Sequence, residues 1–227
     1  GLRSLRLQRK DAQLIIGLQR QYVGHTTAAA RSLTDPAGFQ LPFAFFDWPL
    51  VSHPAEVGAG ETIDQIKKII DKEGADNILA LTLELVGERS GYVLQKDFLD
   101  AADALRTETG IPLVFVEAAG AMGRNGKSLF VTDTTGVTPN MVLWYTGAQL
   151  GQIFVDKQFY VPKPLTLIST WDGDEVCMRR TMCHLREAQV FLGKGVANVF
   201  AEALSKVAGP VKLRGCGLWQ VLDFADE

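Results

Sequence analysis

Apolar residues recur at helical spacing in two separate stretches of the chain. Over residues 61–73 they stand three or four positions apart with lysines between them, and Gly74 follows. Over residues 97–109 the spacing repeats, and Gly110 follows. An apolar stripe of this period is typical of an amphipathic helix, and glycine commonly follows the end of one. The pattern therefore predicts two helices, each with one buried face.

Short and almost continuous apolar runs lie between and after these helices. Residues 77–85, 112–118 and 140–145 are too short for helices of this kind and indicate buried strands. Strands that alternate with helices favour an α/β fold, in which helices cover both faces of a mostly parallel sheet. Such folds build their sites where the carboxyl ends of the strands meet at one edge. Here those ends are Glu84, Glu117 and Thr146.

The pattern changes after residue 150. We predict strands over 151–155 and 165–170, and helices over 175–192 and 196–207. A strand-like run over 211–224 closes the chain. The sequence contains no internal repeat and no low-complexity linker that would separate these elements from the rest.

The composition is that of an ordinary globular protein. The 227 residues are 47% hydrophobic and 22% charged, and the formal net charge is −3. This balance gives no reason to expect nucleic acid as a partner. No stretch approaches the ~18 uninterrupted apolar residues of a membrane helix, so no transmembrane segment is expected.

The cysteines do not suggest a metal site. Cys177, Cys183 and Cys216 form an odd set, and no fourth ligand at a known zinc spacing follows Cys183 and His184. We interpret them as free thiols in a reducing compartment and expect no bound metal.

The first ten residues carry four positive charges and no acid. This composition is typical of an organellar transit peptide, or of what remains after one is cleaved. It equally fits a basic arm at the surface of the protein. Both interpretations stay open at this point.

Several short runs occur in order along the chain and resemble motifs of a known family. They are Phe46-Asp47-Trp48-Pro49, Leu83-Glu84-Leu85-Val86-Gly87-Glu88, Gly123-Arg124-Asn125-Gly126-Lys127, Pro139-Asn140-Met141-Val142-Leu143-Trp144-Tyr145-Thr146-Gly147, Ser169-Thr170-Trp171-Asp172-Gly173-Asp174 and Leu213-Arg214-Gly215-Cys216-Gly217. They resemble the class III aminotransferases, which depend on pyridoxal phosphate (PLP), and most closely the 4-aminobutyrate and lysine-6 branch. The resemblance implies the large domain of the PLP-transferase type I fold.

The departures from that family concentrate where its chemistry takes place. Thr146 stands at the position of the lysine that forms the Schiff base with PLP, and Val116 at that of the aspartate that pairs with the pyridine nitrogen. Threonine can neither form the Schiff base nor shuttle the proton, and valine cannot carry the charge of the aspartate. The resemblance therefore implies a pseudoenzyme, with no cofactor, no catalytic residue and no metal ligand.

Two further positions complete the degenerate site. Tyr22 retains an aromatic residue that lies over the ring in the family, although the run Tyr22-Val23-Gly24-His25 lacks the histidine expected next to it. Thr170 stands where family members contact the phosphate from a neighbouring subunit.

Other polar residues near these positions have simpler interpretations. Glu117 neighbours the lost aspartate, but adjacent residues of a strand point to opposite faces, so Glu117 would need a one-residue shift to replace it. Glu84 is expected to be a solvated or hydrogen-bonded carboxylate at the end of its strand. The run 123–127 could bind an anion, but as a tight turn with a left-handed Gly126 it needs no ligand.

The resemblance also gives the expected domain organisation. Residues 1–11 form the basic amino-terminal arm, and residues 12–175 form the PLP-transferase-like α/β domain. Residues 176–227 form a helical segment and a remnant of the small carboxyl-terminal domain. The amino-terminal third of the family, with its phosphate-binding cup, has no counterpart before residue 12, and the small domain is absent or cut short at Glu227.

These departures suggest a structural role. We expect an inactive aminotransferase-like subunit that binds other protein subunits of a larger complex, with a homodimer less expected than in the family. Eukaryotic relatives of this branch are mitochondrial, so a mitochondrial complex is expected, with the cytoplasm as the alternative. Two other functions stay open: a noncovalent binder of PLP or another phosphate-bearing metabolite, and one fragment of a split aminotransferase.

Overall fold

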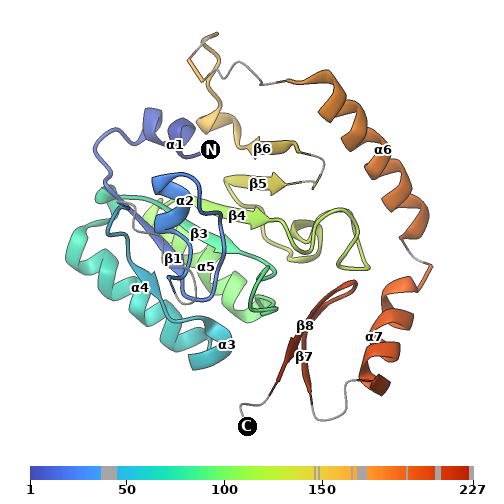
Figure 1. Cartoon of the computed structure of the whole chain (residues 1–227). Coiled ribbons are helices and arrows are strands. Elements are labelled where there is room, and N and C mark those ends of the chain that lie inside the picture. Colours follow the sequence, from blue (N-terminus) through green and yellow to red (C-terminus); the bar gives the residue numbers. More distant parts are fainter. Residues whose placement is uncertain are drawn as a thin grey trace.

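A six-stranded sheet forms the centre of the fold in the computed structural model (Figure 1). The structure describes residues 1–36, 45–145, 147, 149–164, 166–167, 173–192, 194–207 and 211–224. The strands are β1 (Leu14–Leu18), β2 (Leu50–Val51), β3 (Ile78–Glu84), β4 (Leu113–Glu117), β5 (Met141–Tyr145) and β6 (Gly151–Val155). Their order in the sheet is β2-β1-β3-β4-β5-β6. All neighbours pair in parallel except β6, which pairs antiparallel with β5, so the expected α/β fold is confirmed.

Apolar clusters fill the space on both faces of the sheet. On one face, α4 (Ala59–Glu73) and α5 (Lys96–Thr109) contribute Ile66 and Phe98 to a cluster that contains Phe115 of β4. On the other face, α1 (Leu2–Gln8) and the 3-10 turn η3 (Lys157–Phe159) contribute Leu5 and Phe159. Burial on both sides explains why β3 and β4 are continuous apolar runs.

The strongly periodic segments lie where the sequence pattern predicts them. The helices expected over 61–73 and 97–109 are α4 and α5, and each ends within one residue of the predicted glycine. Gly74 and Gly110 adopt φ of 80° and 69° at these ends. Glycine takes such values without the steric cost that a Cβ atom brings, so these two residues end their helices efficiently.

The first sixty residues contain elements that the sequence pattern does not predict. β1 lies inside the sheet between β2 and β3, and the short helices α2 (Ala28–Ser32) and α3 (Pro54–Val57) flank β2 in the chain. The apolar run of β1 is only five residues long and has no helical period. Tertiary contacts therefore decide its structure.

The basic segment 1–11 does not project from the protein as an arm. It contains α1, whose Leu5 is completely buried, and Arg9 donates hydrogen bonds to the carbonyl oxygens of Ile78 (3.1 Å) and Ala75 (2.7 Å). The helix has an apolar side that packs on the sheet while Arg3 stays exposed. These contacts make the segment part of the α/β unit.

Two helices follow the sheet and run along the outside of the molecule (Figure 1). They are α6 (Glu175–Phe191) and α7 (Val196–Val207), and they confirm the helices predicted over 175–192 and 196–207. The strand predicted over 165–170 falls mostly outside the described residues, and its described members Thr166 and Leu167 lie in bends.

The single strand-like run predicted over 211–224 is wrong, because the chain turns back on itself there. β7 (Lys212–Cys216) and β8 (Trp219–Asp223) form an antiparallel hairpin. Its turn lies against the turn that follows β4, where the Leu218 amide donates to the Arg124 carbonyl oxygen at 2.7 Å. A Cβ atom on Gly217 would overlap the Arg124 carbonyl oxygen, so this close approach requires glycine.

Candidate functional site

Two of the four predicted site positions meet at the carboxyl edge of the parallel strands. Tyr22 follows β1 and Val116 lies near the end of β4, and both line one cleft of about 720 Å³. Tyr145, the last residue of β5, lines the same cleft. Thr146 and Thr170 lie outside the described residues. The fold therefore brings two of the predicted positions, Tyr22 and Val116, to the same cleft.

Tyr22 is held in place from three sides. Its backbone amide donates to Glu84 Oε2 at 2.7 Å, and its hydroxyl lies 2.6 Å from His25 Nδ1. The guanidinium of Arg89 lies over its ring, 4.3 Å from the centroid. The sequence pattern alone assigns His25 no role in the site. The only signal available was its position three residues after Tyr22.

Glu84 links two loops at the carboxyl end of β3. One carboxylate oxygen accepts from the Tyr22 amide, and the other accepts from the Glu88 amide at 3.0 Å. The sequence pattern leaves two roles open for the Glu84 carboxylate, solvated or hydrogen-bonded. The structure shows a hydrogen-bonded carboxylate that is not solvated, since only 2% of the residue is exposed. Burial raises the pKa of Glu84 to about 8, although these two amides and Arg89 oppose that shift.

We expect Glu84 to make the folded protein less stable as the pH rises from about 4.5 to about 8. The folded protein keeps the proton up to the raised pKa, whereas the unfolded chain releases it near the ordinary value of 4.5. The folded state thus binds more protons in this window, and its stability falls with pH. The loss amounts to a few kcal/mol at most, because one pKa unit corresponds to about 1.4 kcal/mol.

The Glu84→Gln variant should lack the pH-dependent stability that comes from Glu84. Urea unfolding of the parent and the variant at pH 5 and pH 8 measures this difference, with Glu108→Gln as an exposed control. The variant should also be less stable than the parent at pH 5, because one backbone amide would then face an NH₂ group. If the free energy of unfolding changed equally between pH 5 and pH 8 in the parent and in the variant, the pH dependence would not come from Glu84.

Glu117 points to the face of the sheet opposite Val116. Its strand neighbour is Trp144, whereas Val116 lies beside Leu143. The carboxylate of Glu117 accepts from the backbone amides of Val131 and Thr132, both at 2.8 Å, and from the Thr132 hydroxyl. Burial raises its pKa, and these hydrogen bonds oppose the shift. Glu117 therefore anchors the 131–134 turn, and the strand shows no one-residue shift that would turn its side chain to the face of Val116.

The run 123–127 has the geometry of a tight turn. Arg124 directs its guanidinium back to the carbonyl oxygens of Ala119 (2.7 Å) and Ala118. Gly126 has a φ of 80°, and Asn125 Oδ1 accepts from the amides of Lys127 and Ser128. These contacts support the interpretation as a turn, since the arginine is already engaged by the backbone.

The described lining of the cleft does not fit PLP held as in the resembled family. Val116 contributes an aliphatic side chain to the lining, and the carboxylate of Glu117, another lining residue, is already held by backbone amides. The described lining residues include no lysine. The cleft can accept a small molecule by shape and aromatic contact, but these residues provide no group for Schiff-base chemistry.

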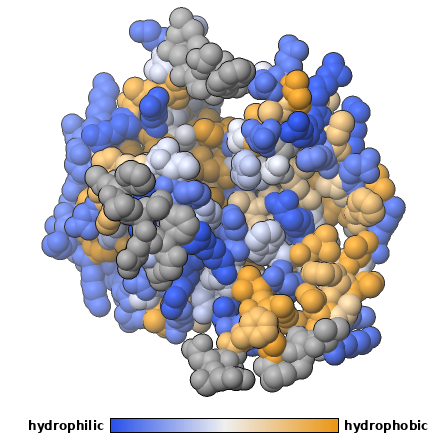
Figure 2. All heavy atoms as spheres, in the orientation of Figure 1, coloured by the Kyte–Doolittle hydropathy of each residue, from blue (hydrophilic) through white to orange (hydrophobic). Residues whose placement is uncertain are grey.

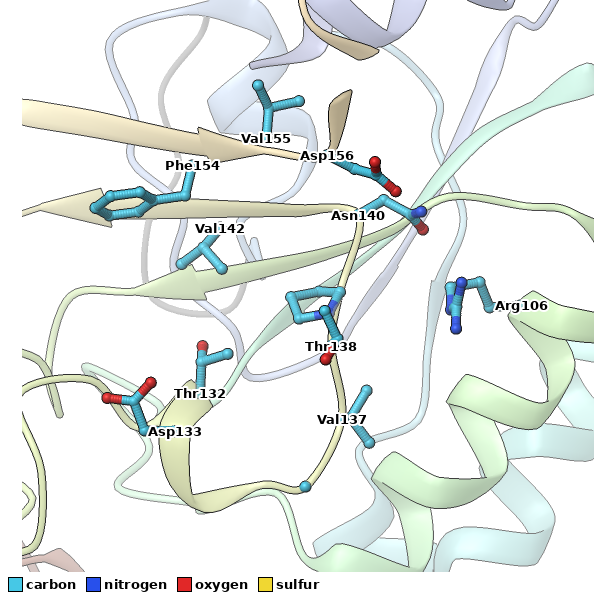
Figure 3. Close-up of a pocket in the computed structure, with 12 residues that line it drawn as sticks. Arg106, Thr132, Asp133, Val137, Thr138, Asn140, Val142, Phe154, Val155 and Asp156 are labelled. Carbon is cyan, nitrogen blue, oxygen red and sulfur yellow. The ribbon is translucent and has the colours of Figure 1, made fainter. Parts of the chain in front are cut away.

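A second cavity of about 860 Å³ lies near the opposite end of β5 (Figure 3). Arg106 of α5, Asp133 of the 3-10 turn η2 (Thr132–Thr134), Asn140 and Asp156 line it. Arg106 is paired with Asp103 at 2.7 Å, and Asn140 Oδ1 accepts from the Leu113 amide at 2.9 Å. It contains none of the site positions predicted from the sequence.

In the described part of the chain, no group of three or more His, Cys, Asp or Glu side chains could hold a metal ion. The three cysteines are free thiols. No described helix has both the length and the apolar character needed to cross a membrane.

The sequence matches part of a curated aminotransferase. No family model matches it. It is 33% identical over 117 residues to an acetylornithine aminotransferase from Archaeoglobus fulgidus, and the aligned part covers 51% of this chain and 28% of that protein.

Solved transaminases share the fold over nearly the whole chain. An amine transaminase from an uncultivated Pseudomonas species matches with a TM-score of 0.84 and 18% identity, over 100% of this chain and 60% of its own. The lysine aminotransferase from M. tuberculosis matches with 0.81 and 20% identity, over 97% and 57%. An omega-transaminase from Thermomicrobium roseum matches with 0.80 and 22% identity, over 99% and 57%. This chain thus spans somewhat more than half the length of the solved transaminases it matches.

Proposed function

We infer the function from one premise, that this chain is a relative of the class III aminotransferases. We propose that it is a catalytically inactive member of that group and serves as a structural subunit of a larger protein assembly. Thr146 and Val116 support the loss of activity, since they replace the two residues on which the chemistry of the family depends. The engaged carboxylate of Glu117 adds to that support.

An exposed apolar surface at the carboxyl-terminal end of the chain carries the proposal of an assembly role. We call it the C-terminal apolar patch, and it consists of Val196, Val199, Phe200, Leu222 and Phe224, all at least 39% exposed. Figure 2 shows apolar residues gathered over α7 and the β7–β8 hairpin. Contiguous exposed patches beyond a few hundred Å² usually mark a site of protein interaction.

The native mass of the protein tests this proposal. The chain is tagged in its source organism, purified under mild conditions, and sized by gel filtration with light scattering. We expect a mass well above that of a homodimer of 24.8 kDa chains, with the same partner proteins recovered in fixed ratio. A tagged protein that elutes as a monomer or homodimer would rule out the assembly role.

We expect the purified chain to form no stoichiometric covalent adduct with PLP. The chain is incubated with PLP, reduced with borohydride, and digested for peptide mapping by mass spectrometry. No single lysine should acquire a pyridoxyl group, because Thr146 replaces the reactive lysine. An active transaminase treated in parallel must carry the label. Stoichiometric labelling of one lysine here would overturn the proposed inactivity.

The proposed location is the mitochondrion, with the cytoplasm as the alternative. The support is the mitochondrial location of eukaryotic members of the resembled branch and the four positive charges in the first ten residues. Imaging of the tagged protein together with a mitochondrial marker distinguishes the two locations.

A second candidate function is noncovalent binding of a small phosphate-bearing molecule. The cleft beside Tyr22 favours it, because an aromatic ring lines a space of about 720 Å³ and the Arg89 cation lies against that ring. Titration calorimetry with PLP and with inorganic phosphate tests it. The third possibility, a split aminotransferase, is disfavoured because a partner would have to insert a lysine where this chain already places Thr146.

A further inference from the structure

We propose that the β7–β8 hairpin sets the position of Tyr22 by fixing the 85–92 loop, which follows β3 in the chain. Tyr22 lines the cleft of about 720 Å³, here called the Tyr22 cleft. The proposal gives a positioning role to two hairpin residues, Arg214 and Trp219, which are not among the described residues that line this cleft. It goes beyond the proposed function and requires neither a partner protein nor a bound ligand.

The hairpin donates two hydrogen bonds to the loop. Arg214 Nε donates to the Ser90 carbonyl oxygen at 2.8 Å, and Trp219 Nε1 donates to the Glu88 carbonyl oxygen at 3.3 Å. These partners are 124 and 131 positions apart in the sequence. The Arg214 guanidinium also lies 4.9 Å from the centroid of the Tyr92 ring. The hairpin therefore contacts the loop at three of its residues.

The loop and the hairpin pack without a gap at Gly91. A Cβ atom on Gly91 would lie 2.8 Å from Val221 Cβ and 3.1 Å from Arg214 Cβ, and the first of these distances is shorter than carbon atoms that are not bonded tolerate. Gly91 also has a φ of 67°, which glycine adopts without steric cost. The position of the loop at this residue thus depends on that of the hairpin.

The same loop holds Tyr22 through the carboxylate of Glu84. The Glu88 amide donates to Glu84 Oε1 at 3.0 Å, and the Tyr22 amide donates to Oε2 at 2.7 Å. Trp219 and Glu84 thus bind the carbonyl oxygen and the amide of one residue, Glu88. The next residue, Arg89, places its guanidinium 4.3 Å from the centroid of the Tyr22 ring. A displaced loop would therefore disturb both the backbone and the ring of Tyr22.

The sheet domain fixes the base of the loop, and the hairpin contacts its tip. At the base, the Leu94 amide donates to the Leu85 carbonyl oxygen at 3.0 Å. At the tip, residues 88–91, the carbonyl oxygens of Glu88 and Ser90 accept from the hairpin. The groups that reach Tyr22 and its carboxylate anchor lie on this tip. The hairpin is therefore placed to control the part of the loop that matters for the cleft.

A double substitution in the hairpin tests the proposal. Arg214→Met combined with Trp219→Phe removes both hydrogen bonds to the loop and keeps apolar side chains of similar size. Amide hydrogen exchange is measured by NMR on the purified chain at Tyr22 and Glu88, with Leu81 of the buried strand β3 as the internal reference. Exchange at Tyr22 and Glu88 should become at least about tenfold faster relative to Leu81, because two hydrogen bonds of ordinary strength are lost.

The titration of Glu84 gives a second readout. Burial is the largest influence on its pKa and raises it to about 8, while Glu88 raises it and Arg89 lowers it. A loosened loop admits water to the carboxylate, so the pKa should fall toward the ordinary value of 4.5 in the double variant. NMR titration of the Glu84 carboxyl carbon measures it. A substitution that lowers only the overall stability would leave this pKa unchanged.

Lys212→Met is the matched control for the loss of charge. Lys212 is exposed, lies two residues before Arg214 on β7, and carries the same charge. Its substitution should leave amide exchange at Tyr22 and the pKa of Glu84 as they are in the parent.

Gly91→Ala tests the same contact without removing a hydrogen-bonding group, and it keeps the proposal testable if the double variant fails to fold. The added Cβ atom would overlap Val221 and force the loop and the hairpin apart, with the same two effects on Tyr22 and Glu84. Gly110→Ala is its control. Gly110 has nearly the same φ, 69°, but no described neighbouring atom lies within 4 Å of its Cβ position. This control should lose stability through backbone strain and leave both readouts unchanged.

Three results would overturn the proposal. In the first, the folded double variant matches Lys212→Met at the Tyr22 amide and in the pKa of Glu84. In the second, exchange becomes faster at Glu88 but not at Tyr22, which would show that the loop does not hold Tyr22. In the third, Leu81 exchanges faster by the same factor, which would show a general loss of stability. All three are measured on the isolated chain, so they are distinct from a failure of the assembly role.

Discussion

A single aspartate on α7 should release this chain from its assembly. Val199 is 66% exposed in the C-terminal apolar patch, so Val199→Asp leaves the fold intact but would place a carboxylate in an apolar contact. Burying an unpaired charge is strongly unfavourable. We expect the affinity for the partner to fall by roughly 100-fold or more, which corresponds to about 2.7 kcal/mol. Recovery of partner proteins with the tagged variant, followed by gel filtration, measures the loss.

Asn198→Asp provides the matched control. Asn198 is also exposed, is the neighbouring residue on the same helix, and gains the same charge without the loss of an apolar side chain. This variant should assemble at least tenfold better than Val199→Asp. If Val199→Asp assembles as well as the parent, the patch is not the contact surface and the assembly proposal loses its main support.

Glu117→Ala should destabilise the folded protein by about 3–5 kcal/mol. The substitution leaves two backbone amides, those of Val131 and Thr132, without their acceptor. The hydroxyl of Thr132 loses its acceptor as well. A buried donor without a partner costs about 1–3 kcal/mol, and three such groups surround one side chain here. Urea unfolding followed by fluorescence measures the change.

Glu117→Gln distinguishes a structural role from a chemical one. An amide keeps one acceptor oxygen, so this variant should lose about half as much stability as Glu117→Ala. Glu117 is among the residues that line the Tyr22 cleft, but its carboxylate is held by the amides of Val131 and Thr132, so both variants should leave ligand binding there unchanged as long as the protein stays folded. If either substitution altered binding in that cleft without a loss of stability, Glu117 would have a role in the site itself.

The sequence predicts the parts of the fold in which local periodicity and burial agree. α4 and α5 are predictable because isoleucine and leucine spacing leaves one face apolar and a glycine follows each helix. β1 is not predictable, because five apolar residues without a period fit several structures equally well. The β7–β8 hairpin is missed for a similar reason. The antiparallel pairing of β7 with β8 and the contact of Leu218 with Arg124 show that the chain reverses near Gly217.

In the candidate site, too, the sequence predicts only what local geometry determines. Alternation along a strand correctly places Val116 and Glu117 on opposite faces, since this depends only on local geometry. The contact between Tyr22 and His25 depends on the path of an irregular loop, for which no residue pattern exists. The burial of Glu84 also could not be foreseen, because it requires two loops from distant parts of the sequence to close over one carboxylate.

The contact between α1 and η3 has a consequence for how the chain folds during synthesis. Ser4 and Phe159 are hydrogen-bonded across a sequence separation of 155 residues, and Leu5 and Phe159 share one apolar cluster. Helix α1 therefore cannot complete its packing until Phe159 has left the ribosome. Such long-range closure slows folding. Until it occurs, the apolar face of α1 and the strands beneath it are open to chaperones and to aggregation.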